Sequence, residues 1–251
     1  SGLSQQEINN EIRPKVNFYV TPENFGAKGD GITDDYESLQ ACFLSGLNVH
    51  LNEKTYATSK TLYHRSNVSI TGCGATNSII LKTTTDTSGL PVLPAPAGAG
   101  NVIYDRDAIL IALPEPGDYC KGVHLTGFSL KKADSLNFTG YGYFAPYIGQ
   151  CTFRDFYASV TEYGIYTVNC WMTEWVRCQG QGKAGWVIGG LTGDLTRGGT
   201  SSTFISCWSL SARAGYYAWN VYNMHSSTFI GASADFIGNT DSIALGVWNV
   251  V

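Results

Sequence analysis

A chain of 251 residues, of which 43% are hydrophobic and only 14% charged, has the composition of a folded protein and is long enough for one large all-β domain. Its net charge of −4 argues against nucleic-acid binding, which normally needs a basic face, and no run of about 18 apolar residues could span a membrane. The seven cysteines form no C-x-x-C pair and no zinc-finger spacing. We therefore expect the cysteines to be buried thiols, although the sequence does not exclude one disulfide. We expect no metal or cofactor.

The first predicted element is a short helix over residues 3–12, where Ser4 and Glu7 have capping-box spacing. An isolated helix of this length is marginal in water. We therefore expect it to pack on the end of the domain or on sister chains of an oligomer. Residues 1–20 are interpreted as helix and linker, and residues 21–251 as one domain.

A glycine-rich turn and a second short helix are predicted next. The glycines and Asp30 within residues 26–31 favour a tight turn with positive φ, and Thr33 offers a side-chain oxygen to cap a helix. Asp34 and Asp35 are expected in the first turn of that helix, where their charges complement its positive end. The apolar face of the helix is formed by Leu39, Cys42 and Phe43.

From residue 49 onward, short β-rich runs are separated by Gly, Asn, Ser and Thr at irregular intervals, as in the coils of a solenoid. A six-residue unit recurs six times, and its second position forms one apolar column: Ile70, Leu125, Phe153, Trp175, Phe204 and Phe229. Its fifth position forms another: Cys73, Phe128, Phe156, Cys178, Cys207 and Ala232. Stacked coils of roughly 20 to 30 residues would bury both columns between parallel strands.

The first position of the unit is polar in every copy, and this fixes the register of the strands. A shift of one residue would bury the carboxylate of Glu174, at a cost of several kcal/mol. The interval between Ile70 and Leu125 is long enough for one additional coil. We expect residues 108–113 to fill it.

Two insertions and the end of the chain interrupt the repeat. Residues 83–101 and 189–202 are rich in Gly and Thr and are expected to be surface loops, where binding sites tend to be built. Residues 242–251 are predicted to form an apolar strand with no polar segment after it. The terminal coil of a solenoid is not stable when such a strand is exposed to solvent. We therefore expect the domain to be truncated at its C-terminus.

The early turn carries a family resemblance. Residues 24–35 read N-F-G-A-K-G-D-G-I-T-D-D, which resembles the N-F/Y-G-A-x-G-D-G-x-T/A-D-D/N start of the pectate-lyase-like superfamily. The resemblance implies a right-handed parallel β-helix with a short N-terminal capping helix, most like a bacteriophage tailspike. In that family the motif is architectural. It implies no catalytic role for Asp30, Asp34 or Asp35.

The candidate site residues are aromatic and titratable. Six tryptophans and fifteen tyrosines suit carbohydrate recognition, because aromatic faces stack on sugars, although Trp175 is expected in the core. Glu174 is the first candidate carboxylate for cleavage, with Thr152 and Thr203 as expected partners. Asp155 and Arg177 occupy equivalent positions of adjacent coils and suit an ion pair or an acidic sugar. The expected catalytic residues are Glu174, Asp155 and Asp235, and the expected substrate-binding residues are Arg177, Trp171, Trp208, Tyr222 and His225.

The leading functional hypothesis is a homotrimeric phage tailspike. It would bind and depolymerise a bacterial capsule, lipopolysaccharide O-antigen or exopolysaccharide, together with other phage tail proteins, in a virion made in the host cytoplasm. Two alternatives stay open: a non-catalytic receptor-binding or structural β-helix of a virion, and a cellular polysaccharide lyase or hydrolase.

The polygalacturonase series N-x-D, D-D, G-H-G and R-I-K is not found in the body of the chain, so activity does not follow from the fold. The sequence leaves open the sugar, its linkage, the choice between hydrolysis and elimination, and whether the catalytic groups lie in this chain, between subunits or beyond Val251.

Overall fold

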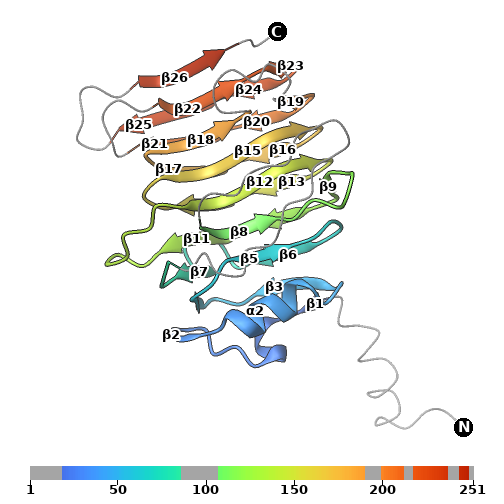
Figure 1. Cartoon of the computed structure of the whole chain (residues 1–251), viewed down its shortest axis with the longest axis vertical. Coiled ribbons are helices and arrows are strands. Elements are labelled where there is room, and N and C mark those ends of the chain that lie inside the picture. The colour runs from blue at the N-terminus through green and yellow to red at the C-terminus, as the bar shows by residue number, and fades with distance from the viewer. Residues whose placement is uncertain (1–18, 86–106, 190–198, 212–216, 237–242, 249–251) are drawn as a thin grey trace, which may run out of the picture.

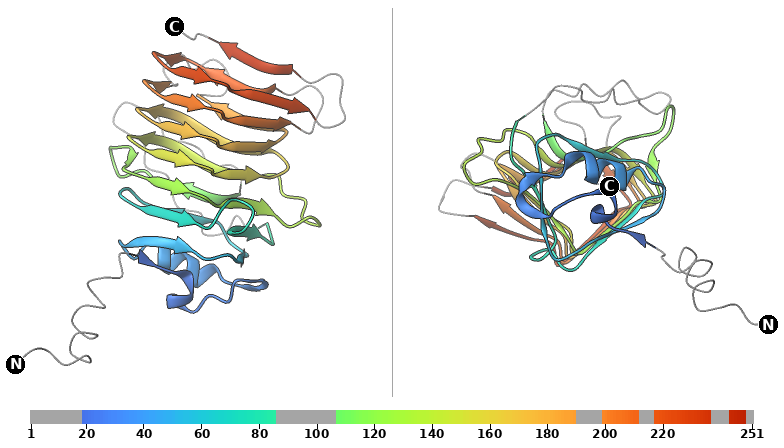
Figure 2. Two further views of the ribbon diagram at one scale, coloured as in Figure 1. Left: turned by 180° about the vertical axis from the view of Figure 1, so that it is seen from behind. Right: turned by 90° about the horizontal axis from the view of Figure 1, so that it is seen from below.

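The computed structural model of the chain describes residues 19–85, 107–189, 199–211, 217–236 and 243–248. Within these residues the chain winds into stacked coils, and each coil adds strands to three sheets that extend along the molecule (Figures 1 and 2). Neighbouring strands of each sheet are parallel. The expected fold class, a right-handed parallel β-helix, is confirmed.

The three sheets are named here by their strands within the described residues. Sheet A contains, in order, β1 (Tyr19–Val20), β3 (Asn48–Leu51), β6 (Ser69–Gly72), β10 (His124–Thr126), β13 (Thr152–Arg154), β16 (Glu174–Val176), β20 (Thr203–Ile205) and β24 (Thr228–Ile230). Sheet B contains β2 (Asp30–Asp34), β4 (Thr55–Thr58), β7 (Ile79–Lys82), β11 (Ser129–Lys132), β14 (Tyr157–Ser159), β17 (Gln179–Gly182), β21 (Trp208–Ser211) and β25 (Ser233–Phe236).

Sheet C has the longest strands. It contains β5 (Leu62–His64), β8 (Ala108–Ala112), β12 (Tyr141–Gly149), β15 (Tyr163–Trp171), β18 (Ala184–Ile188), β22 (Tyr217–Tyr222) and β26 (Ile243–Trp248), with the short strands β9 (Cys120–Lys121), β19 (Gly199–Thr200) and β23 (Met224–His225) beside them. Two helices precede the main stack, η1 (Pro22–Phe25) and α2 (Tyr36–Phe43).

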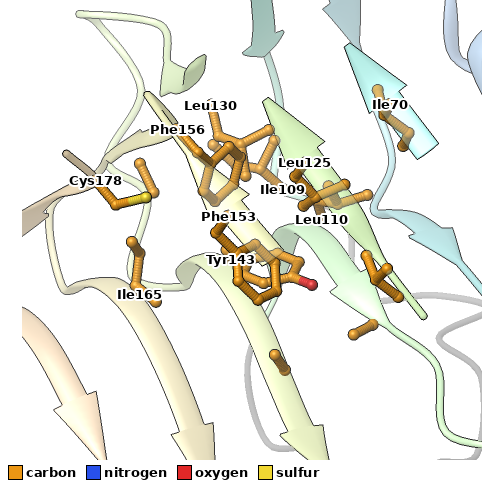
Figure 3. Packing of buried hydrophobic residues seen from close by; sticks show 14 of the residues in the cluster. Ile70, Ile109, Leu110, Leu125, Leu130, Tyr143, Phe153, Phe156, Ile165 and Cys178 are labelled. Carbon is orange, nitrogen blue, oxygen red and sulfur yellow. The ribbon is translucent and has the colours of Figure 1, made fainter. Parts of the chain in front are cut away.

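The interior of the coil is filled by the first predicted apolar column, whose members from Leu125 onward pair from strand to strand of sheet A as expected. Trp175 is fully buried, so its predicted core position is confirmed. Figure 3 shows Phe153 of this column beside Tyr143 of sheet C, and the two ring centroids are 5.7 Å apart. Ile80 and Leu130 of sheet B belong to the same cluster, so the core lies inside the coil and is lined by all three sheets.

Two details of the repeat were predicted wrongly. No coil is skipped, because Ile70 pairs directly with Leu125, and residues 108–112 form β8 of sheet C. An apolar run fits any of the three sheets, so its composition does not assign it to one. The second apolar column is buried in its middle members, but Cys73 and Ala232 at its ends are exposed.

Turns with left-handed backbone connect the sheets at the same place in successive coils. Positive φ occurs before sheet A at Gly122, Gln150, Met172, Ser201 and Ser226, and after sheet A at Gly127, Asp155, Arg177, Ser206 and Gly231. The backbone ladder continues through these turns; for example, the N–H of Met172 donates to the carbonyl of Thr200 and that of Arg177 to Ile205. Outward side chains therefore align in columns along the stack.

The helix predicted after the glycine-rich turn is present as α2, at the N-terminal end of the stack (Figure 1). Leu39, Cys42 and Phe43 are buried in the main core cluster, as expected. The helix begins at Tyr36, later than predicted, so Asp34 and Asp35 precede its first turn. Its role as a cap of the coil stays a prediction.

The aspartates of the motif hold backbone groups of the turn. The carboxylate of Asp35 accepts hydrogen bonds from the N–H groups of Lys28 and Gly29, at 2.6 and 2.9 Å. Asp30 accepts from the backbone and hydroxyl of Thr33, so Thr33 does not cap the helix as expected. Because these carboxylates are engaged with the chain's own turn, their predicted architectural role agrees with the structure.

Several expectations lie outside the described residues. These are the helix over residues 3–12, most of the insertions at 83–101 and 189–202, and residues 249–251. The domain boundary near residue 20 and the C-terminal truncation stay predictions.

All seven cysteines are free and six are buried, whereas Cys73 is exposed. In the described part of the chain, no helix is long and apolar enough to cross a membrane.

Candidate functional site

The outer face of sheet A carries Glu174, the first candidate for catalysis. It stands at the start of β16, outward between Thr152 and Thr203 of the neighbouring strands. Its side chain is 41% exposed, and its carboxylate pairs with the guanidinium of Arg154 one coil earlier. The expected threonine partners are thus replaced by an arginine, because a long side chain can reach across the strand spacing to form a charge-assisted bond.

Asp155 and Arg177 form the predicted ion pair between adjacent coils. Nε and Nη2 of Arg177 donate to the two carboxylate oxygens of Asp155, at 2.7 and 2.6 Å. The hydrogen bond with Asp155 raises the pKa of Arg177. Both residues lie in left-handed turns at equivalent places, so the pair joins two coils at the surface. Their catalytic and sugar-binding roles stay predictions.

The three candidate catalytic carboxylates are not gathered in one cleft. Glu174 and Asp155 lie on the side of sheet A, and each faces an arginine. Asp235 is an exposed residue of β25 in sheet B, in register with Leu210. Glycoside hydrolysis needs two carboxylates within about 5 to 9.5 Å of each other. Asp235 lies on a different sheet from Glu174, whereas Asp155 follows Arg154, the arginine that pairs with Glu174, so the catalytic roles of these carboxylates stay predictions.

Trp171 and His225 lie on the edge between sheets C and A. Both pair with Thr200, Trp171 from β15 and His225 from β23. The Trp171 indole packs over Gly149, where a Cβ would clash with the ring, and the Nζ of Lys121 is 5.7 Å from the ring centroid. Trp171 is therefore half-buried by its own chain, whereas His225 is exposed.

The remaining aromatic candidates have separate positions. Tyr222 ends β22, is half-buried, and has its pKa raised by burial. Trp186 of β18 is fully buried in the core. Trp208 is half-buried at the start of β21 in sheet B, where it pairs with Gln179. Its partner Gln179 lines a hollow that was not predicted from the sequence.

This hollow lies on the outer face of sheet B and has a volume of about 310 Å³. It is lined by residues of β11, β14 and β17: Lys131, Tyr157, Ala158, Ser159, Gln179 and Gln181. In register, these side chains form two outward columns, Tyr157–Gln179–Trp208 and Lys131–Ser159–Gln181. We name it the sheet B hollow.

A signal for the sheet B hollow was present in the sequence. Five of its six lining residues stand one or three positions after the second apolar column, as Tyr157 and Ser159 follow Phe156. Extending the six-residue unit by two positions would have placed them side by side on one face. Among the described residues, no group of three or more His, Cys, Asp or Glu side chains could hold a metal ion.

Comparison with known proteins finds phage proteins that are similar to this chain. No family model matches the chain. Over 63 residues it is 36% identical to the preneck appendage protein of Bacillus phage PZA, a match that covers 25% of this chain and 7% of that protein. The gp42 tailspike of Acinetobacter phage vb_AbaP_AS12 superposes with a TM-score of 0.80 and 34% identity, over 89% of this chain and 38% of the tailspike.

A third structure, Geobacillus virus E2 ORF18, matches with a TM-score of 0.69 and 18% identity, over 92% of this chain and 45% of its own. At that identity the match shows the fold alone. The chain spans less than half the length of each of these proteins. The predicted resemblance to a tailspike β-helix is confirmed, and the relatives are proteins of phages, in agreement with the expected place in a virion.

Proposed function

We propose that the chain is part of a phage tail protein whose β-helix binds a polysaccharide on the surface of a host bacterium. The observation that carries the proposal is the 34% identity to a phage tailspike over 89% of the chain. A polar outward column on sheet A and columns of polar and aromatic side chains on sheet B support it, because such surfaces bind sugars by hydrogen bonding and stacking. The polysaccharide would be a capsule, an O-antigen or an exopolysaccharide.

The proposed assembly is a homotrimer that attaches to other phage tail proteins. The likeness to a tailspike and to an appendage protein supports a place in the tail. Light scattering coupled to size-exclusion chromatography should give three times the 27.1 kDa of one chain. A monomer at micromolar concentration would contradict the trimer for this chain.

Cleavage of the bound polysaccharide is the finer part of the proposal. Glu174 would act as acid or base, because it is the half-exposed carboxylate on the outer face of sheet A. Asp155 and Asp235 remain the proposed second carboxylates. The pairing of Glu174 and Asp155 with arginines favours the non-catalytic binding protein as the second candidate function, since both carboxylates are already engaged.

The test uses purified capsular polysaccharide from Acinetobacter strains, chosen because the tailspike relative comes from an Acinetobacter phage. Adsorption of the protein to capsulated but not to acapsular cells is expected. Shortening of the polymer would show cleavage, and products that absorb in the ultraviolet would identify a lyase. Glu174→Gln should abolish shortening, whereas Glu37→Gln, at an exposed glutamate of α2, should not.

The outcomes separate the two candidate functions. Binding without shortening by the parent protein would favour the non-catalytic reading. Shortening that persists in a folded Glu174→Gln variant would remove Glu174 from the reaction. No adsorption to any capsulated strain in the panel or to a panel of capsulated Bacillus strains would contradict the proposed function itself.

A further inference from the structure

The sheet B hollow presents one positive charge and no negative charge. Lys131 is the only charged residue among the six that line it. Within the described part of the chain, the side chains of Lys131 and Gln179 make no hydrogen bond or ion pair. Asp235 is four strands away in the Lys131 column, and the nearest acidic residue of that column, Asp34, is three strands away on the other side, which corresponds to about 14 Å at the usual strand spacing. At physiological salt, with a screening length of about 8 Å, neither carboxylate neutralises the ammonium group.

One amide group of the hollow is oriented to donate outward. The hydroxyl of Ser159 donates to Oε1 of Gln181 at 2.8 Å, so the carbonyl of this amide is engaged and its NH₂ group is free to donate outward. Gln179 adds a second amide, and Tyr157 adds a hydroxyl. A lysine ammonium and two amide NH₂ groups on one face suit a carboxylate, which accepts several hydrogen bonds and is bound more strongly by charged donors.

Aromatic side chains flank these donors on the same face. Tyr157 and Trp208 stand on either side of Gln179 in its column, two strand spacings or about 9.5 Å apart. Both are half-buried, so part of each ring is available. Aromatic faces pack on the apolar faces of sugars, while the polar groups between them fix the orientation of the ring.

We infer that the sheet B hollow binds a carboxylate-bearing sugar of the polysaccharide, with Lys131 on the carboxylate, Gln179 and Gln181 on neighbouring oxygens, and Tyr157 and Trp208 against the sugar rings. The inference rests on the proposed function and adds the chemical class of the ligand and its place. It also assigns the binding surface to sheet B, away from the Glu174 and Arg177 pairs of sheet A. Ligand binding here requires no metal and no bond breaking.

The experiment measures binding of the chain to capsular polysaccharide from each strain to which it adsorbs. Each polymer is used in its native form and after carbodiimide and borohydride reduction of its carboxyl groups to alcohols. Three variants are compared: Lys131→Met, Lys131→Arg, and Lys132→Met as a matched control. Lys132 is the next residue of the same strand, and its Nζ donates to the carbonyls of Ala133 and Asp134 rather than lining the hollow.

Lys131→Met should weaken binding of the native polymer about fivefold, the size expected for one partly exposed charge pair, and Lys131→Arg should retain most of it. Lys132→Met should bind as the parent does. Carboxyl reduction should weaken binding by the parent and leave little difference between the parent and Lys131→Met. Thermal unfolding by circular dichroism checks that each variant is folded.

The results distinguish the inference from its premise. Equal binding of native and reduced polymer by the parent, or equal loss in the two methionine variants, would overturn the acidic-sugar assignment while leaving polysaccharide binding intact. Absence of binding by the parent to every polymer would overturn both. Weakening by Tyr157→Ala but not by Lys131→Met would place a neutral sugar in the hollow and would also overturn the assignment.

Discussion

The indole of Trp175 stacks on the ring of Phe153 in the preceding coil, with centroids 3.7 Å apart and planes 12° from parallel. On its other side the indole is parallel to Phe204, and its edge meets Trp186 of sheet C. The side chain is fully buried. It therefore joins three coils and two sheets at one point in the core.

Truncation of this residue should be costly. Trp175→Ala removes the stack and leaves a cavity, so the free energy of unfolding should fall by about 3–5 kcal/mol. Trp175→Phe should lose less, because it keeps a ring between Phe153 and Phe204. Urea unfolding followed by circular dichroism measures both, with Ile230→Ala as a control at a side chain that is 53% exposed. Equal losses at Trp175 and Ile230 would contradict the packing.

The left-handed turns predict a substitution that stabilises the protein. Met172 has φ of 50° and an exposed side chain, and a left-handed backbone costs an L-residue about 1–2 kcal/mol. Glycine removes that strain but loses about 0.5–1 kcal/mol of conformational freedom, so Met172→Gly should gain up to about 1 kcal/mol. Differential scanning calorimetry would show a higher melting temperature. A lower one would mean that the methionine side chain contributes contacts.

The reverse substitution provides the matched test. Gly231 occupies the corresponding turn after sheet A, with φ of 60°, and a Cβ there would approach nothing closer than the hydroxyl of Ser206 at 3.7 Å. Gly231→Ala should therefore destabilise by strain alone, by about 1 kcal/mol. A neutral result would show that the turn can change its conformation.

The core column could be predicted because the repeat carries its own register. Phe153 and Trp175 pair as expected although 22 residues separate them (175 − 153), since one apolar side chain per coil must face inward. The sequences of the sheet C strands carry no such repeated pattern. All nine residues of β12 are buried, because its two faces belong to two different hydrophobic clusters, and alternation disappears when both faces of a strand are covered.

The candidate site was less predictable for physical reasons. The pairing of Asp155 with Arg177 followed from equivalent places in adjacent turns, and the structure contains it. The pairing of Glu174 with Arg154 depends on how a flexible side chain crosses from one strand to the next, which sequence spacing does not specify. The sheet B hollow combines three coils, so no single stretch of sequence carries it.

Trp208 offers a test of the binding face. Trp208→Ala should weaken polysaccharide binding about 3- to 10-fold, the range for one aromatic stacking contact. The backbone carbonyl of Trp208, which accepts from Nε1 of Trp186, is retained in the variant. Isothermal titration with the bound polysaccharide measures the change. Trp171→Ala, on the edge between sheets C and A, is the control, and a larger loss there would move the binding face to that edge.

A buried ion pair between Lys82 and Asp107 predicts a non-additive double mutant. Nζ lies 3.1 Å from Oδ1, and the side chains are 0% and 5% exposed. Asp107→Asn should destabilise by about 3–5 kcal/mol, because it leaves the lysine charge buried. Lys82→Met combined with Asp107→Asn should recover part of that loss. Chemical denaturation of the single and double variants gives the coupling, and additive losses would contradict a paired charge.

The buried imidazole of His64 predicts how stability depends on pH. Its Nε2 lies 3.0 Å from the hydroxyl of Tyr143 and its Nδ1 3.2 Å from the carbonyl of Arg65, an arrangement that suits a neutral ring donating from Nδ1. Burial lowers the pKa of His64 from 6.5 to about 4. As the pH falls, the unfolded chain therefore takes up this proton before the folded one does. The contribution of His64 to stability is present above about pH 6.5 and is lost as the pH falls toward 4.

Between pH 7 and pH 4.5 this single group should lower the free energy of unfolding by about 2–3 kcal/mol. Urea titrations at the two pH values measure the drop in the parent, in His64→Gln, and in His124→Gln, where the histidine is exposed on β10. His64→Gln is expected to be less stable at pH 7 but to show a drop smaller by that amount, because glutamine takes up no proton. His124→Gln should follow the parent. Equal drops in all three proteins would mean that His64 is protonated in the folded chain at ordinary pH, or that acid instability arises entirely from the carboxylates.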